Sequence, residues 1–129
     1  MDTINIDYFQ KLDIRVGTVV KAEVPQWSHW VMKLEVDFGE EIGHRIIFSG
    51  IMLFYKPEDL EGKQLPFVIN LEKKKIGLEG DHSEGMMLMA VASKKEMGQD
   101  PVKVGEEEVD EYPILFDLPE KVSNGTRVM

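Results

Sequence analysis

The sequence predicts an all-β domain whose strands close into a small barrel. Five stretches that are rich in β-branched residues, alternate in polarity or are continuously apolar recur along its 129 residues at roughly even spacing. Two short helical patterns accompany them, one before the first strand and one between the third and fourth, and neither is long enough to connect parallel strands. We therefore expect a five-stranded OB-fold Greek-key barrel, while the pattern leaves an SH3-like barrel or a small sandwich open.

The N-terminal part of the chain predicts a helix of one or two turns and then a long strand. Ile6, Phe9 and Leu12 recur at helical spacing and would form one apolar face. The stretch "DIRVGTVVKAEV" that follows is rich in β-branched residues and predicts the first strand. Within it, Gly17 is expected to mark a bulge or a sharp bend.

Four further strands and a second helix follow from the pattern. Residues 32–38 alternate strictly between apolar and charged side chains, which is typical of a strand with one buried face. Pro57 and Gly62 are the start and stop signals of a short helix. The predicted strands are, in chain order, "MKLEVDF" from Met32, "HRIIFSG" from His44, "LPFVINL" from Leu65 and "GMMLMAVAS" from Gly85.

Length and charge predict one domain, residues 1–129, with an acidic loop or extension at about residues 94–120. Residues 1–104 carry 17 acids against 13 bases, whereas residues 105–120 carry seven acids and no base. The formal net charge of −9 argues against a generic nucleic-acid binder, whose surface is usually basic. Because the acidic excess is concentrated in one segment, another face can remain positive, so net charge alone does not decide the function.

Composition and motifs exclude several classes of protein. The chain has no cysteine, no apolar run of membrane-spanning length and no signal-like N-terminus, so we expect a cytoplasmic protein without membrane contact. The common phosphate-binding, metalloprotease and hydrolase motifs do not occur, and the three histidines lie in different segments. The sequence therefore predicts no enzyme, no metal site and no cofactor.

Basic and aromatic residues suggest where a ligand could bind. The most basic run is Lys73 to Lys75, which by itself is as consistent with a solvated turn as with a binding site. If the barrel places Lys33 and Arg45 beside this run, a local positive groove would form on an acidic protein. Trp27 and Trp30 could stack unpaired bases, or they could cap the barrel or bury against a partner.

Six stretches taken in order resemble a known family. They are "IDYFQKLDIRVGTVVKAE", "LEVDFG", "IIFSGI", "YKPEDLEGK", "VINLEKKKIG" and "SEGMMLMA". In this order the chain resembles the tRNA-binding OB domain of many methionyl-tRNA synthetases, of free-standing tRNA-binding proteins and of the secretion-related chaperone CsaA. The resemblance covers roughly residues 4–92. It implies an OB barrel, usually a homodimer, that binds the L-shaped body of tRNA rather than a base sequence.

The resemblance also implies site residues. The tRNA-binding face would comprise Lys33, Arg45, Ser49, Asn70, Lys73, Lys74, Lys75, Ser83 and Met86. The cationic side chains would neutralise phosphates, Asn70 and Ser83 would donate hydrogen bonds to phosphate or 2′-OH groups, and Met86 would offer an apolar contact. The homodimer would be built partly through the N-terminal helix, with Ile6, Phe9 and Leu12 as its apolar face.

Some positions depart from the family pattern, and more than one function follows. His29-Trp30-Val31 stands where the family commonly has Asp-Lys-Leu, and residues 94–120 are longer and more acidic than the usual ending. The first hypothesis is a non-catalytic RNA-binding homodimer that recognises tRNA by shape and phosphate backbone. The second is a CsaA-like chaperone dimer that binds unfolded polypeptide through its Trp residues and the strand containing Met86, Met87 and Met89. A third is a module that docks onto an aminoacyl-tRNA synthetase.

Overall fold

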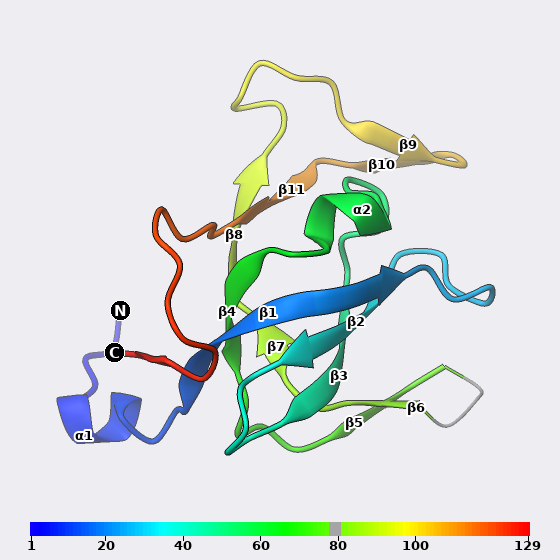
Figure 1. Ribbon diagram of the computed structural model, residues 1–129. Coiled ribbons are helices and arrows are strands. Elements are labelled where there is room, and N and C mark those ends of the chain that lie inside the picture. The colour runs from blue at the N-terminus through cyan, green and yellow to red at the C-terminus, as the bar shows by residue number, and fades with distance from the viewer. Residues whose placement is uncertain (78–80) are drawn as a thin grey trace.

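A computed structural model describes residues 1–77 and 81–129 and shows an all-β molecule with two short helices (Figure 1). The elements are α1 (Ile6–Phe9), β1 (Ile14–Glu23), β2 (Met32–Asp37), β3 (His44–Ser49), α2 (Pro57–Leu60), β4 (Gln64–Val68), β5 (Lys74–Ile76), β6 (Asp81–Ser83), β7 (Met86–Met87), β8 (Met89–Ser93), β9 (Val102–Val104), β10 (Glu107–Val109), β11 (Glu111–Leu115) and β12 (Arg127–Val128). The main sheet has the order β3-β2-β1-β4-β7, and β12 also pairs with β1.

The main sheet curls into a nearly closed barrel. Its strand pairs are antiparallel. The backbone N–H of Glu84, just before β7, donates to the carbonyl of Ile46 in β3 at 2.8 Å, so the last strand segment returns to the other edge of the sheet. This confirms the predicted OB-type barrel, with one helix before β1 and the other between β3 and β4.

Strand β1 is the centre of the barrel sheet, because it pairs with β2, β4 and β12. The bulge predicted at Gly17 is wrong: the register shift against β2 lies between Val19 and Lys21. Glycine is required at position 17 for packing, because a Cβ atom there would lie 2.5 Å from Val36 Cγ1 and 2.7 Å from the ring of Phe38. The missing side chain lets these two residues pack directly against β1.

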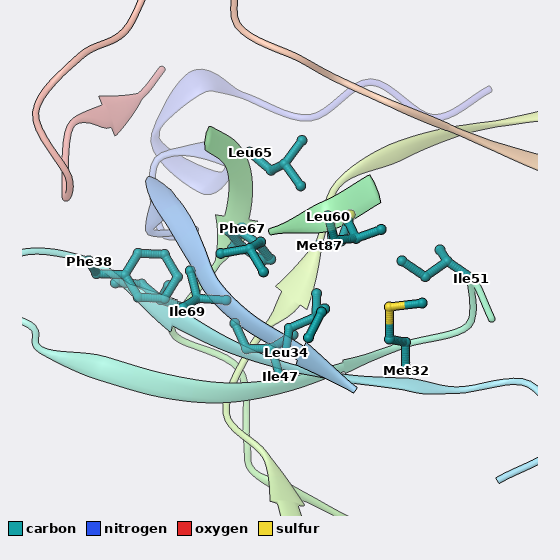
Figure 2. Packing of buried hydrophobic residues seen from close by; sticks show 13 residues of the cluster. Met32, Leu34, Phe38, Ile47, Ile51, Leu60, Leu65, Phe67, Ile69 and Met87 are labelled. Carbon is teal, nitrogen blue, oxygen red and sulfur yellow. The ribbon is translucent and has the colours of Figure 1, made fainter. Parts of the chain in front are cut away.

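The barrel interior is filled with apolar side chains from every barrel strand except β12 and from α2 (Figure 2). The alternation predicted for residues 32–38 is confirmed, because Met32, Leu34, Val36 and Phe38 are all buried. The rings of Phe38 and Phe67 meet edge to face with their centroids 5.5 Å apart, a favourable aromatic geometry. Helix α2 forms as predicted and adds the fully buried Leu60 to this core.

Helix α1 and the chain termini lie together at one side of the barrel (Figure 1). Asn5 caps the helix, because its side-chain oxygen accepts a hydrogen bond from the N–H of Tyr8 at 2.8 Å. No residue of α1 is buried. Within residues 1–77 and 81–129, neither helix has the length or the apolar character that a membrane crossing requires.

Residues 86–115 differ from the prediction. The single strand expected from Gly85 is divided, with β7 paired to β4 on the barrel and β8 paired to β11 outside it. The segment at about residues 94–120, expected to be an acidic loop or extension, contains the β9–β10 hairpin, whose two strands turn at Gly105 with φ +64°. Together β8, β11, β9 and β10 form an arm above α2 (Figure 1). The hydroxyl of Tyr55 donates to the carbonyl of Pro113 at 2.7 Å and ties this arm to the barrel.

Candidate nucleic-acid interface

The lysine run lies on a β-hairpin that projects from the barrel (Figure 1). Strands β5 and β6 pair with Lys74 opposite Ser83 and Ile76 opposite Asp81. Residues 78–80 lie outside the described residues. Lys74 and Lys75 are exposed, and neither forms an ion pair with a carboxylate in the described parts of the chain. Within those parts, no carboxylate competes with an anionic ligand for either ammonium group.

Two of the residues predicted for the site fix the base of this hairpin to the barrel. Ser83 is only 8% exposed, and its Oγ accepts from the N–H of Phe48 and donates to the carbonyl of Gly85, both at 3.0 Å. Arg45 is half-buried, and its Nη1 donates to the carbonyl of Ile69 at 2.6 Å. These contacts explain why the hairpin keeps a defined position relative to β3.

Asn70 connects the start of the hairpin to the N-terminal segment. Its side-chain oxygen accepts from the N–H of Asp13 at 2.8 Å, and its Nδ2 donates to the carbonyl of Lys11 at 2.6 Å. The carboxylate of Asp13 in turn accepts a 2.6 Å hydrogen bond from Nε of Arg15, which raises the pKa of that guanidinium above its ordinary value. Ser49, another predicted site residue, is buried at the end of β3.

Lysines beside the hairpin are matched by carboxylates. Nζ of Lys33 lies 3.5 Å from Asp81 and 3.9 Å from Glu23, and Nζ of Lys21 lies 3.9 Å from the same Glu23. We call these four residues the paired face. Arg45 and Lys33 do lie beside the hairpin, but the acidic side chains there offset the positive groove that the sequence suggested. Lys73, at the base of β5, is also paired, because its Nζ lies 3.8 Å from a carboxylate oxygen of Glu84.

A cavity of about 450 Å³ lies between the hairpin and the loop that connects β1 to β2. Trp27 packs against the hairpin, because a Cβ atom on Gly77 would lie 2.7 Å from its ring. Trp30 is 60% exposed. We call Trp27, Trp30, Lys74 and Lys75 the hairpin edge. The residues that line the cavity are Trp27, Ser28, His29, Trp30, Val31, Phe48, Lys74, Lys75, Ile76 and Gly77.

Sequence reasoning identified the two tryptophans and the lysines separately, but it did not bring them into one site. The tryptophans precede the lysines by more than 40 residues, so only the fold shows that they share a cavity. Met86 lies on β7 and is 49% exposed, whereas its neighbour Met87 points into the core. Within the described residues, no three acidic, histidine or cysteine side chains are placed to hold a metal ion.

The sequence and the fold agree with those of known proteins. Residues 14–127 match the family model described as a putative tRNA binding domain. The chain belongs to this family. It is 43% identical over 127 residues to the methionine–tRNA ligase of Archaeoglobus fulgidus, a match that covers 98% of this chain and 16% of the ligase. The chain spans only 13% to 16% of the length of the methionine–tRNA ligases that it matches.

Solved structures confirm the predicted family and its OB-like barrel. The methionyl-tRNA-synthetase-related protein from Pyrococcus horikoshii is similar over the full length of both chains, with 36% identity and a TM-score of 0.79. The chaperone CsaA from Bacillus anthracis is similar over 99% of this chain and 100% of its own, with 30% identity and a TM-score of 0.73. This tRNA-binding domain therefore resembles both a synthetase-related protein and a chaperone.

Proposed function

We propose that this tRNA-binding domain is a non-catalytic module that binds tRNA in the cytoplasm, recognising its shape and phosphate backbone, and that it acts as a homodimer. The observation that carries the proposal is the projecting hairpin of a tRNA-binding-type barrel, where Lys74 and Lys75 are exposed and not matched by described carboxylates. Exposed lysines that are not paired with a carboxylate can neutralise phosphates without first breaking an ion pair. Lys73 directly precedes these two lysines in the chain, and Met86 is exposed on β7. Arg45, Asn70 and Ser83 fix the base of the hairpin through hydrogen bonds.

A titration of labelled tRNA followed by fluorescence anisotropy tests this function. Affinity should fall steeply between low and moderate salt, because phosphate contacts release counterions. Replacing Lys73, Lys74 and Lys75 together with Glu should abolish binding at both salt concentrations. The matched control replaces Lys56, Lys103 and Lys121, which are exposed elsewhere, and changes net charge equally. Absence of any tRNA-dependent signal for the unmodified protein at low salt would overturn the proposal, and equal losses in both triple variants would remove the hairpin from the site.

The homodimer rests on apolar side chains of α1 and of the segment that directly follows it. Ile6, Phe9 and Leu12 are 64%, 38% and 39% exposed, so they do not pack into the barrel of their own chain. They line a shallow hollow together with Val128 and Met129 at the C-terminus. Burial of this face against a second copy would remove it from water.

Light scattering coupled to size exclusion tests the homodimer. The unmodified chain should elute as a dimer and Phe9→Asp as a folded monomer, since α1 contributes nothing to the core. Val104→Asp, an equally exposed apolar position on β9, is the control and should remain dimeric. A monomeric unmodified chain would contradict this part of the proposal.

A second candidate function is binding of unfolded polypeptide by the same dimer. Two observations favour it: the exposed apolar side chains of Trp30 and Met86, and the structural similarity to the chaperone CsaA. This function predicts suppression of the aggregation of an unfolded client protein with little dependence on salt, because apolar contacts are not screened. Suppression by unmodified protein that is lost in Trp30→Ala would support it, and no suppression would exclude it under those conditions.

Association with an aminoacyl-tRNA synthetase is a further part of the proposal. It is supported by the identity between this chain and segments of methionine–tRNA ligases. A binding module joined or docked to a synthetase would raise the effective concentration of tRNA near the enzyme. Co-purification of a synthetase with the tagged chain from its own cells at low salt tests this association.

A further inference from the structure

The hairpin edge contains an apolar cavity in addition to the exposed cations that a contact with a phosphate backbone requires. A backbone contact needs exposed cations, yet this cavity is walled largely by aromatic and aliphatic groups, among them Trp27, Phe48 and Ile76. The ring centroids of Trp27 and Phe48 are 6.1 Å apart at an interplanar angle of 40°. At about 450 Å³, the cavity falls within the size range of small-ligand sites, roughly 300–1,000 Å³.

The loop that carries Trp30 is held in a defined conformation. Ser28 Oγ donates to the carbonyl of Val31 at 2.7 Å and accepts from the N–H of the same residue at 2.8 Å. The carbonyl of Trp30 accepts from the N–H of Met52 at 3.2 Å. A Cβ atom on Gly50 would lie 3.5 Å from Trp30 Cδ1, so the indole lies close to the backbone there. Trp30 is thus exposed on an ordered support, as an aromatic platform requires.

The charge at this cavity is positive, unlike that of the paired face. Lys74 and Lys75 line it, and no Asp or Glu is among its lining residues in the described chain. Pockets over the neighbouring barrel surface are lined by Glu23, Asp81 or Glu84 together with lysine. Among the described residues, the cavity therefore combines an aromatic platform with cations and with no acidic residue in its lining, and this pair of features matches a nucleobase with its phosphate.

We propose that this cavity receives one unpaired nucleotide of the bound RNA, an inference that rests on the proposed RNA-binding function. The base stacks on the indole of Trp30, and Lys74 or Lys75 contacts the adjoining phosphate. A base inside a duplex cannot enter, because its neighbours in the stack cover both of its faces. Stacking of this kind tolerates any base, so the site selects unpaired nucleotides without reading a sequence. A polypeptide is less well matched, since its backbone brings no negative charge to the two lysines.

Matched RNA ligands test this inference. The probes are a blunt RNA duplex, the same duplex with a short single-stranded overhang, and the duplex with an abasic overhang that has the same phosphates but no bases. Unmodified protein should bind the base-bearing overhang roughly tenfold or more tightly than the abasic one. Trp30→Ala should remove this advantage and Trp30→Phe should keep most of it, while both variants bind the blunt duplex as the unmodified protein does. Circular dichroism of each variant confirms folding.

The outcomes separate this inference from the function on which it rests. No binding of any RNA at low salt overturns the proposed function and this inference with it. Binding of the base-bearing and abasic overhangs with equal affinity overturns the inference alone, as does an advantage that survives in Trp30→Ala. If an unfolded polypeptide quenches the fluorescence of Trp30 and displaces the overhang from it, the cavity takes polypeptide and the nucleotide assignment is wrong.

Discussion

The paired face and the hairpin edge both carry two lysines, but in opposite settings. On the paired face, Lys21 and Lys33 lie 3.5 to 3.9 Å from Glu23 or Asp81. At the hairpin edge, Lys74 and Lys75 have no described carboxylate within ion-pair distance and share a cavity with two tryptophans. The two regions are neighbours, because Asp81, which pairs with Lys33, belongs to the strand opposite Lys75 and Ile76.

The number of lysines on a surface therefore does not measure the attraction of that surface for RNA. Ion pairs at a protein surface contribute only about 0–1 kcal/mol to stability, and those of the paired face are exposed or half-buried. Each of these ion pairs nevertheless places a carboxylate where a phosphate would approach. To bind RNA, the lysine must therefore give up its carboxylate partner for the phosphate. On a protein with a net charge of −9, lysines that are not matched by carboxylates are therefore the stronger candidates for contact with a polyanion.

The largest expected effect compares the two lysine pairs directly. Lys74→Ala with Lys75→Ala should weaken tRNA binding roughly 10- to 100-fold near 0.1 M salt and flatten the salt dependence, because two phosphate contacts are lost. Lys21→Ala with Lys33→Ala changes net charge equally and should weaken binding only a few-fold. Anisotropy titrations at several salt concentrations measure both. Equal losses in the two double variants would show that pairing with carboxylates does not decide which lysines bind.

A second prediction separates anchoring from binding within the hairpin. Ser83→Ala leaves the buried N–H of Phe48 without its hydrogen-bond acceptor, which should cost about 1–3 kcal/mol of unfolding free energy. Chemical denaturation measures this cost, and Ser123→Ala, at an exposed serine, is the control. If Ser83 acted mainly as an RNA ligand, the variant would instead keep its stability and lose affinity.

A third prediction concerns Asn70, which could either anchor the N-terminal segment or contact RNA. Asn70→Ala removes the hydrogen bonds to Asp13 and Lys11 and should lower the unfolding free energy by about 1 kcal/mol, since water can replace part of this contact. Hydrogen exchange of residues 1–13 should rise, while tRNA affinity changes less than twofold. Gln99→Ala, at an exposed amide, should change neither quantity. A large loss of affinity with unchanged exchange would make Asn70 a ligand and not a tether.

The parts of the fold that follow from local sequence could be predicted. Strict alternation over residues 32–38 placed β2 and its buried face, and Pro57 with Gly62 placed α2. The division of residues 85–93 could not be predicted, because β7 and β8 form one continuous apolar run and differ only in their partners, β4 and β11. The strands of the β9–β10 hairpin have three residues each, too few to produce a recognisable period.

The candidate site was less predictable than the fold because its decisive contacts join distant residues. The residues around Lys33 in the sequence do not predict its ion pair with Asp81, which is 48 positions later and lies 3.5 Å from its ammonium group. In the same way, the sequence around Lys74 and Lys75 does not predict that they line a cavity together with Trp30. The sequence could name charged and aromatic candidates, but matching one charge with another requires the strand register, and that is a property of the whole barrel.

The smallest expected effect comes from freeing one paired lysine beside the hairpin edge. Glu84→Gln keeps the oxygen that accepts from the N–H of Ile46 and replaces the carboxylate oxygen 3.8 Å from Lys73 with a neutral amide. Lys73 then no longer has to leave the carboxylate of Glu84, so tRNA affinity should rise about twofold to fivefold at low salt and the gain should fade as salt screens the charges. Glu58→Gln changes net charge equally on α2, away from the hairpin, and should raise affinity less. If both variants gain alike, only net charge matters; a larger gain from Glu84→Gln would show that local pairing limits the lysines available to RNA.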